Sequence, residues 1–497
     1  MSYKSETLSY IDANADQYTG ISHEIWGFAE LSLKEYKSAA LYIEALKAEG
    51  FTVTENLGGM PTAFCGSYGS GRPYIGILAE YDALSGLSQK GASAVREPVE
   101  GQTATDSGHG CGHSMLGAGS FGAACAVKNY LKSTKTPGTV IFFGCPGEEG
   151  GAGKAFLAKD GYWKDLDAAL TWHPGSVNEV VTGTCNSCIQ VLYKFKGIAA
   201  HAAGSPEMGR SALDAVELMN TGVQYLREHM KSDCRIHYAI TNAGGASPNV
   251  VQPEADVLYM VRSVAVEDSI ALQARVDKIA EGAALMTETT YERIFVDGTA
   301  NTVPNYMLEK LMHDKMAEVG VPQYTDEEWA YAAALKKTYP EKGVLPGMAA
   351  QKDPKIAQEV AGMVKMPQEL SEKLGAAAEG LAEKPLNDFL APFDHGNDFS
   401  PGSTDVGDVS WQTPAVQFHA VCEPSGVPGH SWQIVSCGAS SIGDKGLIFA
   451  AKVLALAAID LYEKPELLKA AKDEWKVAAA KGYTCPIPAD AKPYVIE

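Results

Sequence analysis

The chain has 497 residues, of which 45% are hydrophobic and 21% are charged, and its formal net charge is −20. This composition is that of a chain that buries a large core, so a disordered or fibrous protein is excluded. An excess of acidic residues repels phosphate backbones and anionic membrane surfaces. We therefore expect neither nucleic acid nor a membrane among its partners.

The cysteines and the apolar segments indicate the compartment. The ten cysteines have no repeating spacing, and a chain of this size needs no disulfide framework. The start, MSYKSETLSYIDANADQY, lacks the basic and apolar regions of a signal peptide. The apolar stretch LIFAAKVLALAAIDLY is too short to span a bilayer and contains Lys452 and Asp460. We expect a cytoplasmic protein with reduced thiols.

Helix and strand patterns alternate along the first 186 residues. A helix (38–50) and a strand (51–56) come first, and three apolar runs then predict buried strands within 72–84, 136–151 and 167–175. A segment rich in small residues, 114–133, predicts a helix between the first two runs. The alternation predicts an α/β fold, a catalytic domain with a mainly parallel sheet flanked by helices and an active site at the carboxyl ends of the strands.

A second pattern follows from residue 187. It predicts strand, helix, strand, strand, helix and strand, which is an inserted α+β domain. We therefore expect a discontinuous catalytic domain of residues 1–186 and 299–497, interrupted by a domain of residues 187–298. Residues from about 320 to 395 predict several helical segments, to which we assign no function. The C-terminal part, from Ala415, returns to a strand and a buried helix.

Three short motifs are weak. Cys185 and Cys188 form a lone CxxC without the second pair of a zinc ribbon. The GxGxxG of Gly117 to Gly122 lies inside a predicted helix, which favours close helix packing over a dinucleotide site. The segment from Gly150 to Lys154 resembles a phosphate loop, but its spacing is wrong. None of these motifs decides the function.

A stronger pattern joins metal-binding residue types to the ends of predicted strands. Cys111 and His113 lie in the glycine-rich GHGCGHS, and thiolate and imidazole both bind divalent metals, although both residues can equally serve packing. Glu148 and Glu149 follow a buried strand, where one carboxylate can ligate a metal and the other can act as general base. A solvated turn is the alternative for this pair. His173 and His430 also follow apolar strands, and these coincidences together favour a metal site.

The ordered set of motifs resembles the M20 metallopeptidases and amidohydrolases over nearly the whole chain. The matching segments are ILAEYDAL, GHGCGH, GCPGEEGGAGKAF, TWHPG, AHAAGSPEMGRSALDAV, SPNVV, GSTDVGDVSW and PGHSW. The resemblance implies two divalent ions, Mn²⁺ or Zn²⁺, held by Cys111, His113, Glu149, His173 and His430.

The resemblance also implies roles for the neighbours of these ligands. Cys111 stands where the wider group has a bridging aspartate, and His113 replaces a histidine whose place is taken by Glu80. Glu148 matches the general base, and Asp82 matches an acid that orients a ligand. Ser114 departs from the pattern, because the related branch usually has Asp or Asn there.

The inserted domain matches the lid of the family, which also forms the dimer face. His201 matches a histidine that reaches the active site of the partner chain and donates to the oxyanion of the tetrahedral intermediate. Asn249 and Arg262 match a pair that contacts the substrate's α-carboxylate. On the sequence alone, Arg262 could equally be a surface arginine of a strand.

The function implied by the resemblance is metal-dependent hydrolysis of the amide bond of N-acyl amino acids, with p-aminobenzoyl-glutamate as the leading substrate. The alternatives are a dipeptidase or another N-acyl-amino-acid amidohydrolase and, from a different class, a non-catalytic partner subunit. Intact Glu148 and the five metal ligands argue against a silent subunit. We expect a homodimer, or a heterodimer with a related chain.

Overall fold

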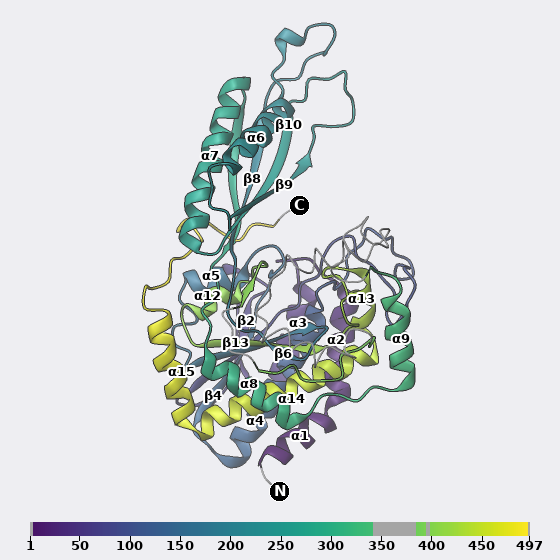
Figure 1. The fold of residues 1–497 in the computed structure, drawn as a ribbon, viewed down its shortest axis with the longest axis vertical. Coiled ribbons are helices and arrows are strands. Elements are labelled where there is room, and N and C mark those ends of the chain that lie inside the picture. The colour runs from purple at the N-terminus through teal and green to yellow at the C-terminus, as the bar shows by residue number, and fades with distance from the viewer. Residues whose placement is uncertain (1–2, 341–383, 394–397, 496–497) are drawn as a thin grey trace, which may run out of the picture.

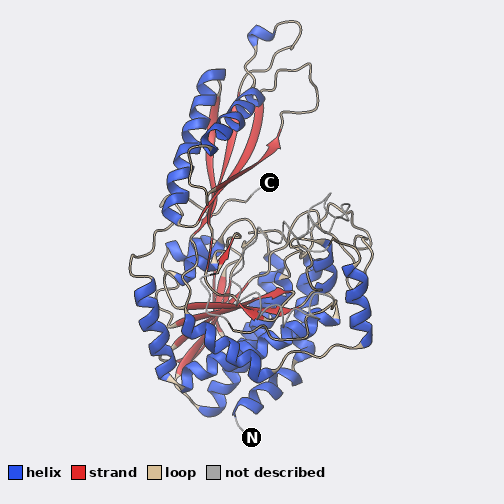
Figure 2. Ribbon diagram, in the orientation of Figure 1, coloured by secondary structure: helices blue, strands red, loops and turns tan. Residues whose placement is uncertain are grey.

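The computed structural model describes residues 3–340, 384–393 and 398–495. Its larger part is a layered body of sheet and helices, and a smaller sheet with two helices projects from this body (Figure 1). Figure 2 shows that helices cover the sheet of the larger part and lie along one face of the smaller sheet. The mixed α/β class that we expected is confirmed.

A seven-stranded sheet forms the centre of the larger part, in the order β1-β2-β4-β3-β5-β13-β6. The strands are β1 (Thr52–Glu55), β2 (Phe64–Ser70), β3 (Tyr74–Ala79), β4 (Gly138–Gly144), β5 (Ala168–Gly175), β6 (Glu179–Val180) and β13 (Ala415–Val421). The four central strands, β4, β3, β5 and β13, are parallel, and the outer strands pair antiparallel. The carboxyl ends of the central strands therefore meet at one edge, as predicted.

Helices surround this sheet. They are α1 (Tyr3–Ala13), α2 (Ala15–Phe28), α3 (Tyr36–Ala48), α4 (His113–Thr134), α5 (Gly153–Lys159), α8 (Tyr306–Val319), α9 (Asp326–Lys336), α12 (Val406–Ser410), α13 (Trp432–Gly438), α14 (Ser441–Glu463) and α15 (Pro465–Ala478). Helices α4 and α14 pack on each other and on β5. A Cβ atom on Gly119 of α4 would lie 2.8 Å from the Trp172 ring, so the small residues of this helix serve close packing.

The inserted unit has its own sheet and its own core. Its elements are β8 (Ser187–Lys196), α6 (Ala212–Arg227), β9 (Arg235–Asn242), β10 (Glu254–Ser263), α7 (Val266–Thr287) and β11 (Thr290–Thr299). The antiparallel strand order is β11-β8-β10-β9, and α6 and α7 bury apolar residues against β8 and β10. We propose residues 187–298 as the domain limits, because β8 begins at Ser187 and β11 ends at Thr299.

Some elements differ from the prediction. Two helices, α1 and α2, precede the predicted first helix, and β2 was not predicted. The two-residue strands β7 (Thr184–Cys185) and β12 (Phe399–Ser400) pair with each other. Most of the region from 320 to 395 lies outside the described residues, and its described part contains α9. Within the described ranges, no helix is long and apolar enough to cross a membrane.

Candidate metal centre

The predicted ligands lie at the carboxyl edge of the seven-stranded sheet. Glu80 and Asp82 follow β3, Glu148 and Glu149 follow β4, and His173 lies near the end of β5. This edge is where parallel α/β sheets place their functional side chains. Segments that are far apart in the sequence therefore deliver their side chains to one place.

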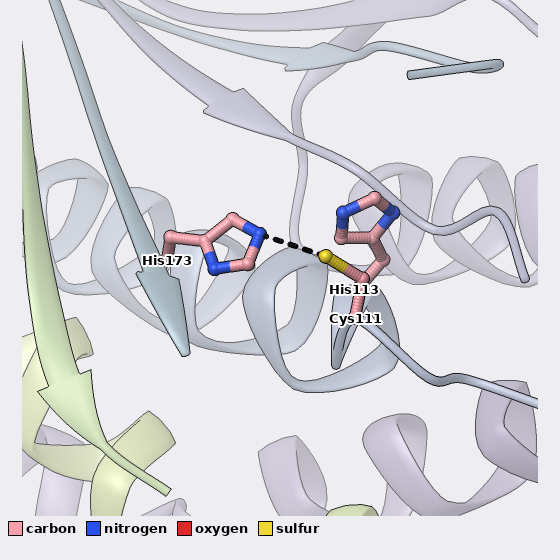
Figure 3. Close-up of side chains that lie close together, drawn as sticks. All are labelled: Cys111, His113 and His173. Atoms are coloured by element: carbon pink, nitrogen blue, oxygen red, sulfur yellow. Dashed lines mark hydrogen bonds between the residues drawn. The ribbon is translucent and has the colours of Figure 1, made fainter. Parts of the chain in front are cut away.

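Cys111 lies at the centre of the cluster. Its Sγ is 3.4 Å from Nε2 of His173, and the His113 ring lies beside both residues (Figure 3). On the other side, Nε2 of His430 is 3.4 Å from Oε2 of Glu149. The ligand atoms of Cys111, His113 and His173 all lie within 4.8 Å of one another, and so do those of Cys111, Glu149 and His430. The structure thus brings the five predicted ligands together in two groups that share Cys111.

Asp82 orients two members of the cluster. Its Oδ1 lies 2.8 Å from Nδ1 of His113, and its Oδ2 accepts hydrogen bonds from Ser32 Oγ at 2.7 Å and from the backbone N–H of Glu149 at 2.9 Å. Burial opposes the ionisation of Asp82, but His113 and these hydrogen bonds outweigh it, and the pKa of Asp82 falls to about 2. An ionised Asp82 fixes Nδ1 of His113 and leaves Nε2 to face the cluster, as carboxylates do for metal-bound histidines.

His173 is oriented by the backbone. Its Nδ1 donates a hydrogen bond to the Pro174 carbonyl at 2.7 Å. Burial and the nearby His113 lower the pKa of His173 to about 4, so the ring is neutral at pH 7. The lone pair on Nε2 therefore points toward Cys111 and is available to a metal.

Two buried atoms of the cluster lack hydrogen-bond partners. They are Nε2 of His113 and Oε1 of Glu149. Buried polar atoms are nearly always satisfied, so two orphans in one cluster of sulfur, nitrogen and oxygen donors need a reason. A divalent cation bound there would satisfy both atoms, and the mixed thiolate, imidazole and carboxylate donors suit such an ion.

Glu148 lies beside the cluster and not at its centre. Its Oε2 is 4.0 Å from Nε2 of His113. Burial, with Glu80 and Glu149 as anionic neighbours, raises the pKa of Glu148 well above its usual range. A carboxylate that holds a proton readily and adjoins a metal site has the properties of a general base that later returns the proton.

Lys154 is a residue whose role the sequence reasoning missed. Its buried Nζ lies 2.6 Å from Oε1 of Glu80 and 2.7 Å from Oδ1 of Asp405. Its only signal in the sequence is a lysine in a glycine-rich segment, five residues after Glu149, whose spacing does not fit a phosphate loop. The partner Asp405 lies in the GSTDVGD segment, 251 residues away.

A cavity of about 470 Å³ opens beside the cluster. Its lining includes Glu148, Asp405 and all predicted ligands except His113. The inserted unit contributes Arg262, whose Nη1 donates a hydrogen bond to Ser403 Oγ at 2.7 Å. Arg262 therefore lies in the cavity of its own chain, and is not a surface arginine.

His201 and Asn249 lie elsewhere. Both are exposed, and they adjoin each other because the backbone N–H of Ala202 donates to the Asn249 carbonyl. The loop of His201 follows β8 and includes the short helix η2 (Pro206–Met208), at the end of the inserted unit farthest from the seven-stranded sheet (Figure 1). The structure does not bring Asn249 together with Arg262, and neither Asn249 nor His201 lines the cavity.

Two further sequence features take no part in the cluster. Cys185 and Cys188 are free thiols beside Thr302 and Thr299, and no group of possible ligands among the described residues includes them. Ser114 is buried and its Oγ has no hydrogen-bond partner, so the structure gives this departure from the family pattern no compensating contact.

Comparisons with known proteins identify the family of the chain. The model of peptidase family M20/M25/M40 matches residues 76–431. The chain is 43% identical to a p-aminobenzoyl-glutamate hydrolase subunit of Escherichia coli K12 over 97% of each chain, and 25% identical to the Xaa-Arg dipeptidase of Mus musculus over 95% of this chain and 92% of that protein.

Solved structures show the same fold. A putative aminohydrolase from methicillin-resistant Staphylococcus aureus has a TM-score of 0.56 at 15% identity and covers 92% of this chain and 99% of its own. An aminobenzoyl-glutamate utilization protein from Klebsiella pneumoniae has a TM-score of 0.54 at 15% identity and covers 88% of this chain and 97% of its own. With the match to the family model and to a 43% identical relative, these findings show that the chain belongs to peptidase family M20/M25/M40.

Proposed function

We propose that this metal-dependent amidohydrolase cleaves N-acyl amino acids, with p-aminobenzoyl-glutamate as its leading substrate. The observation that carries the proposal is one cavity that holds metal-ligand types, the carboxylate of Glu148 and the guanidinium of Arg262. The near full-length relative at 43% identity is named as a p-aminobenzoyl-glutamate hydrolase subunit, which supports the substrate.

The proposed ligands are Cys111, His113, Glu149, His173 and His430, which would hold two ions, Mn²⁺ or Zn²⁺. When bound, divalent ions polarise an amide carbonyl and lower the pKa of water, so that a nucleophile forms at neutral pH. Cys111 would contribute to both groups of ligands. Asp82 and the Pro174 carbonyl hold the two imidazole rings in position for this role.

Three other residues transfer the proton or bind the substrate. Glu148 takes a proton from the attacking water and delivers it to the leaving amine, because its burial keeps its proton affinity high. Arg262 pairs with the α-carboxylate of the amino acid that leaves. His201 donates to the oxyanion from the lid of a second chain, because its own lid does not place it in its own cavity.

The assembly would be a homodimer, or a heterodimer with a related chain. Two different subunits of the p-aminobenzoyl-glutamate hydrolase of Escherichia coli K12 are relatives of this chain, at 43% and 26% identity, and this supports a partner of related sequence. All ten cysteines are free thiols, which is consistent with a cytoplasmic location.

The test is hydrolysis of a panel of N-acyl amino acids and dipeptides with added manganese or zinc. We expect the highest kcat/KM for p-aminobenzoyl-glutamate, with free p-aminobenzoate and glutamate as products. A preference for peptides that end in arginine would favour a dipeptidase, the activity named for the 25% identical relative. No hydrolysis with metal-loaded protein, alone or mixed with a related partner chain, would favour a non-catalytic role.

A further inference from the structure

Glu80 adjoins the metal ligands and has no role in the proposed function. It lies directly after β3 and is 3% exposed. Its Oε1 faces Lys154, and its Oε2 lies 3.2 Å from Nε2 of His113. The ligand atoms of Glu80, His113 and Glu148 lie within 4.8 Å of one another, which makes them a third group that could hold a metal ion.

The contact between Glu80 and His113 has the distance of a hydrogen bond but not its direction. Nε2 of His113 has no hydrogen-bond partner, although Oε2 of Glu80 is only 3.2 Å away. The oxygen therefore lies off the axis along which the ring nitrogen donates or shares its lone pair.

This geometry is that of two ligands of one ion. Bonds of about 2.0–2.2 Å at tetrahedral or octahedral angles place two ligand atoms roughly 3.0–3.5 Å apart, each off the other's axis. The distance from Cys111 Sγ to His173 Nε2 and that from Glu149 Oε2 to His430 Nε2 are both 3.4 Å, so the 3.2 Å between Glu80 and His113 is close to the separation in the other two pairs.

We propose that Glu80 is a sixth metal ligand, which binds through Oε2 the same ion as Nε2 of His113. This inference rests on the proposed metal centre and extends it. The family resemblance implies only that Glu80 stands in the place of a histidine ligand of the wider group. The structure indicates that a ligand is retained at this position, with oxygen in place of nitrogen.

Lys154 and Asp405 hold Glu80 in position for this role. Nζ of Lys154 binds Oε1 of Glu80 and Oδ1 of Asp405, and the backbone N–H of Lys154 donates to Oδ2 of Asp405 at 2.8 Å. All three side chains are buried, and Lys154 and Asp405 are fully so. Because Lys154 occupies one oxygen of Glu80, the carboxylate cannot rotate freely, and its second oxygen stays directed at His113.

The charges of this group also call for a cation. Glu80 and Asp405 are two buried carboxylates that share one lysine, so together they carry a net negative charge beside Glu148. Buried charge without a partner is strongly unfavourable. A divalent ion bound between Glu80 and His113 would neutralise this charge.

The experiment measures metal stoichiometry and affinity in the full-length protein. Wild type and Glu80→Gln are titrated with Zn²⁺ or Mn²⁺ against a chelator, and bound ions are counted by elemental analysis. Glu80→Gln should keep one tightly bound ion and bind the other more than about 100-fold more weakly, since loss of a direct ligand exceeds the 10–100-fold cost of losing a supporting partner.

Two further variants separate a ligand from a support. Lys154→Met should weaken the binding of the same ion by roughly 10–100-fold, because Lys154 affects this ion only by holding Glu80. Asp297→Asn is the matched control, since Asp297 is a buried carboxylate that lines the same cavity but pairs with Gln190 outside the cluster. It should bind both ions as wild type does. With cobalt, the thiolate charge-transfer band of Cys111 should persist in all three variants.

Two ions bound to Glu80→Gln with wild-type affinities would overturn the inference and leave Glu80 as a neighbour of His113. If Glu80→Gln does not fold, Glu80→Asp replaces it in the experiment. The shorter aspartate keeps the negative charge beside Lys154 but moves the ligating oxygen away from the ion, so the same loss of metal affinity is expected. Failure of wild type to bind metal, or an unchanged metal content in Cys111→Ala, would instead refute the proposed metal centre itself.

Discussion

The histidine rings at the edge of the seven-stranded sheet and the histidine at the far end of the inserted unit are held in place differently. At the sheet edge, the His113 and His173 rings are each held by a defined partner, Asp82 or the Pro174 carbonyl. At the far end of the inserted unit, His201 is exposed, and its Nδ1 accepts only from backbone N–H groups of its own loop. The cluster at the sheet edge is assembled within one chain, whereas the role that we propose for His201 requires a second chain.

The length of β10 shows how far apart these two places are. The strand runs from Glu254 to Ser263, which is nine steps of about 3.3 Å and so roughly 30 Å. Arg262 lies at the end near the cavity, and Asn249 lies beyond the opposite end. One substrate carboxylate cannot touch both residues of a single chain. If both bind it, the second residue comes from another chain.

The largest effect should come from the sheet edge. Glu148→Gln should lose about 10²–10⁴-fold in kcat, because the general base is removed, while its metal content stays at the wild-type value. Glu149→Gln should instead lose metal, since its carboxylate lies within the cluster. Turnover and elemental analysis of both variants test the roles. Equal metal loss in the two would mean that the roles are wrongly assigned.

The next effect tests the far end of the inserted unit. His201→Ala should lower kcat by about 10²–10³-fold with little change in KM, because a donor to the oxyanion acts only in the transition state. Its metal content should be that of wild type. Steady-state kinetics with p-aminobenzoyl-glutamate measure both constants.

Mixing variants decides whether His201 acts between chains. Inactive His201→Ala and inactive Glu148→Gln, exchanged into hybrid dimers, should regain part of the wild-type activity, because one of the two sites then has both residues intact. If exchange is demonstrated and activity does not return, His201 serves its own chain or has no catalytic role.

Arg262 should give a smaller effect of a different kind. It lines the cavity and would hold the α-carboxylate in ground and transition states alike, so Arg262→Ala should chiefly raise KM. An amide analogue without a free α-carboxylate should be a poor substrate for wild type and little worse for the variant. An unchanged KM with a lowered kcat would contradict this role.

Much of this site could be predicted from the sequence, because its signals are local. The strands before Glu80 and Glu148 and the strand that contains His173 are apolar runs that end in polar or glycine-rich turns, and parallel strands must bring such ends to one edge. The helix that begins at His113 likewise follows from its run of small residues. These features need no knowledge of which distant segments touch.

The other features of the site and fold could not be predicted, because they depend on contacts between distant residues or on strands too short to show an alternating pattern. The pairing of Lys154 with Asp405 joins residues 251 positions apart, and neither residue alone predicts the other. Strands of two residues, such as β7, show no alternation. Asn249 and Arg262 are far apart because β10 is one continuous strand between them. The family resemblance names the two residues as a pair and does not predict this separation.

The smallest expected effects are changes in stability that compare the packing of the two regions. A matched pair of glycines, each inside a 22-residue helix, tests this difference. Gly119→Ala in α4 would place a Cβ 2.8 Å from the Trp172 ring and 3.1 Å from the Leu447 carbonyl, and overpacking of this kind costs about 1–3 kcal/mol. Gly282→Ala in α7 meets nothing within 4 Å, so the better helix propensity of alanine should stabilise the protein by about 0.5–1 kcal/mol.

Chemical denaturation of the two alanine variants measures the difference. Because Trp172 precedes His173, Gly119→Ala should also weaken metal binding, whereas Gly282→Ala should leave it unchanged. A stabilised Gly119→Ala would mean that α4 can shift away from β5, and the sheet edge would then be less rigid than its packing indicates. A destabilised Gly282→Ala would instead mean that another surface covers α7 in solution, and the proposed second chain would be the first candidate.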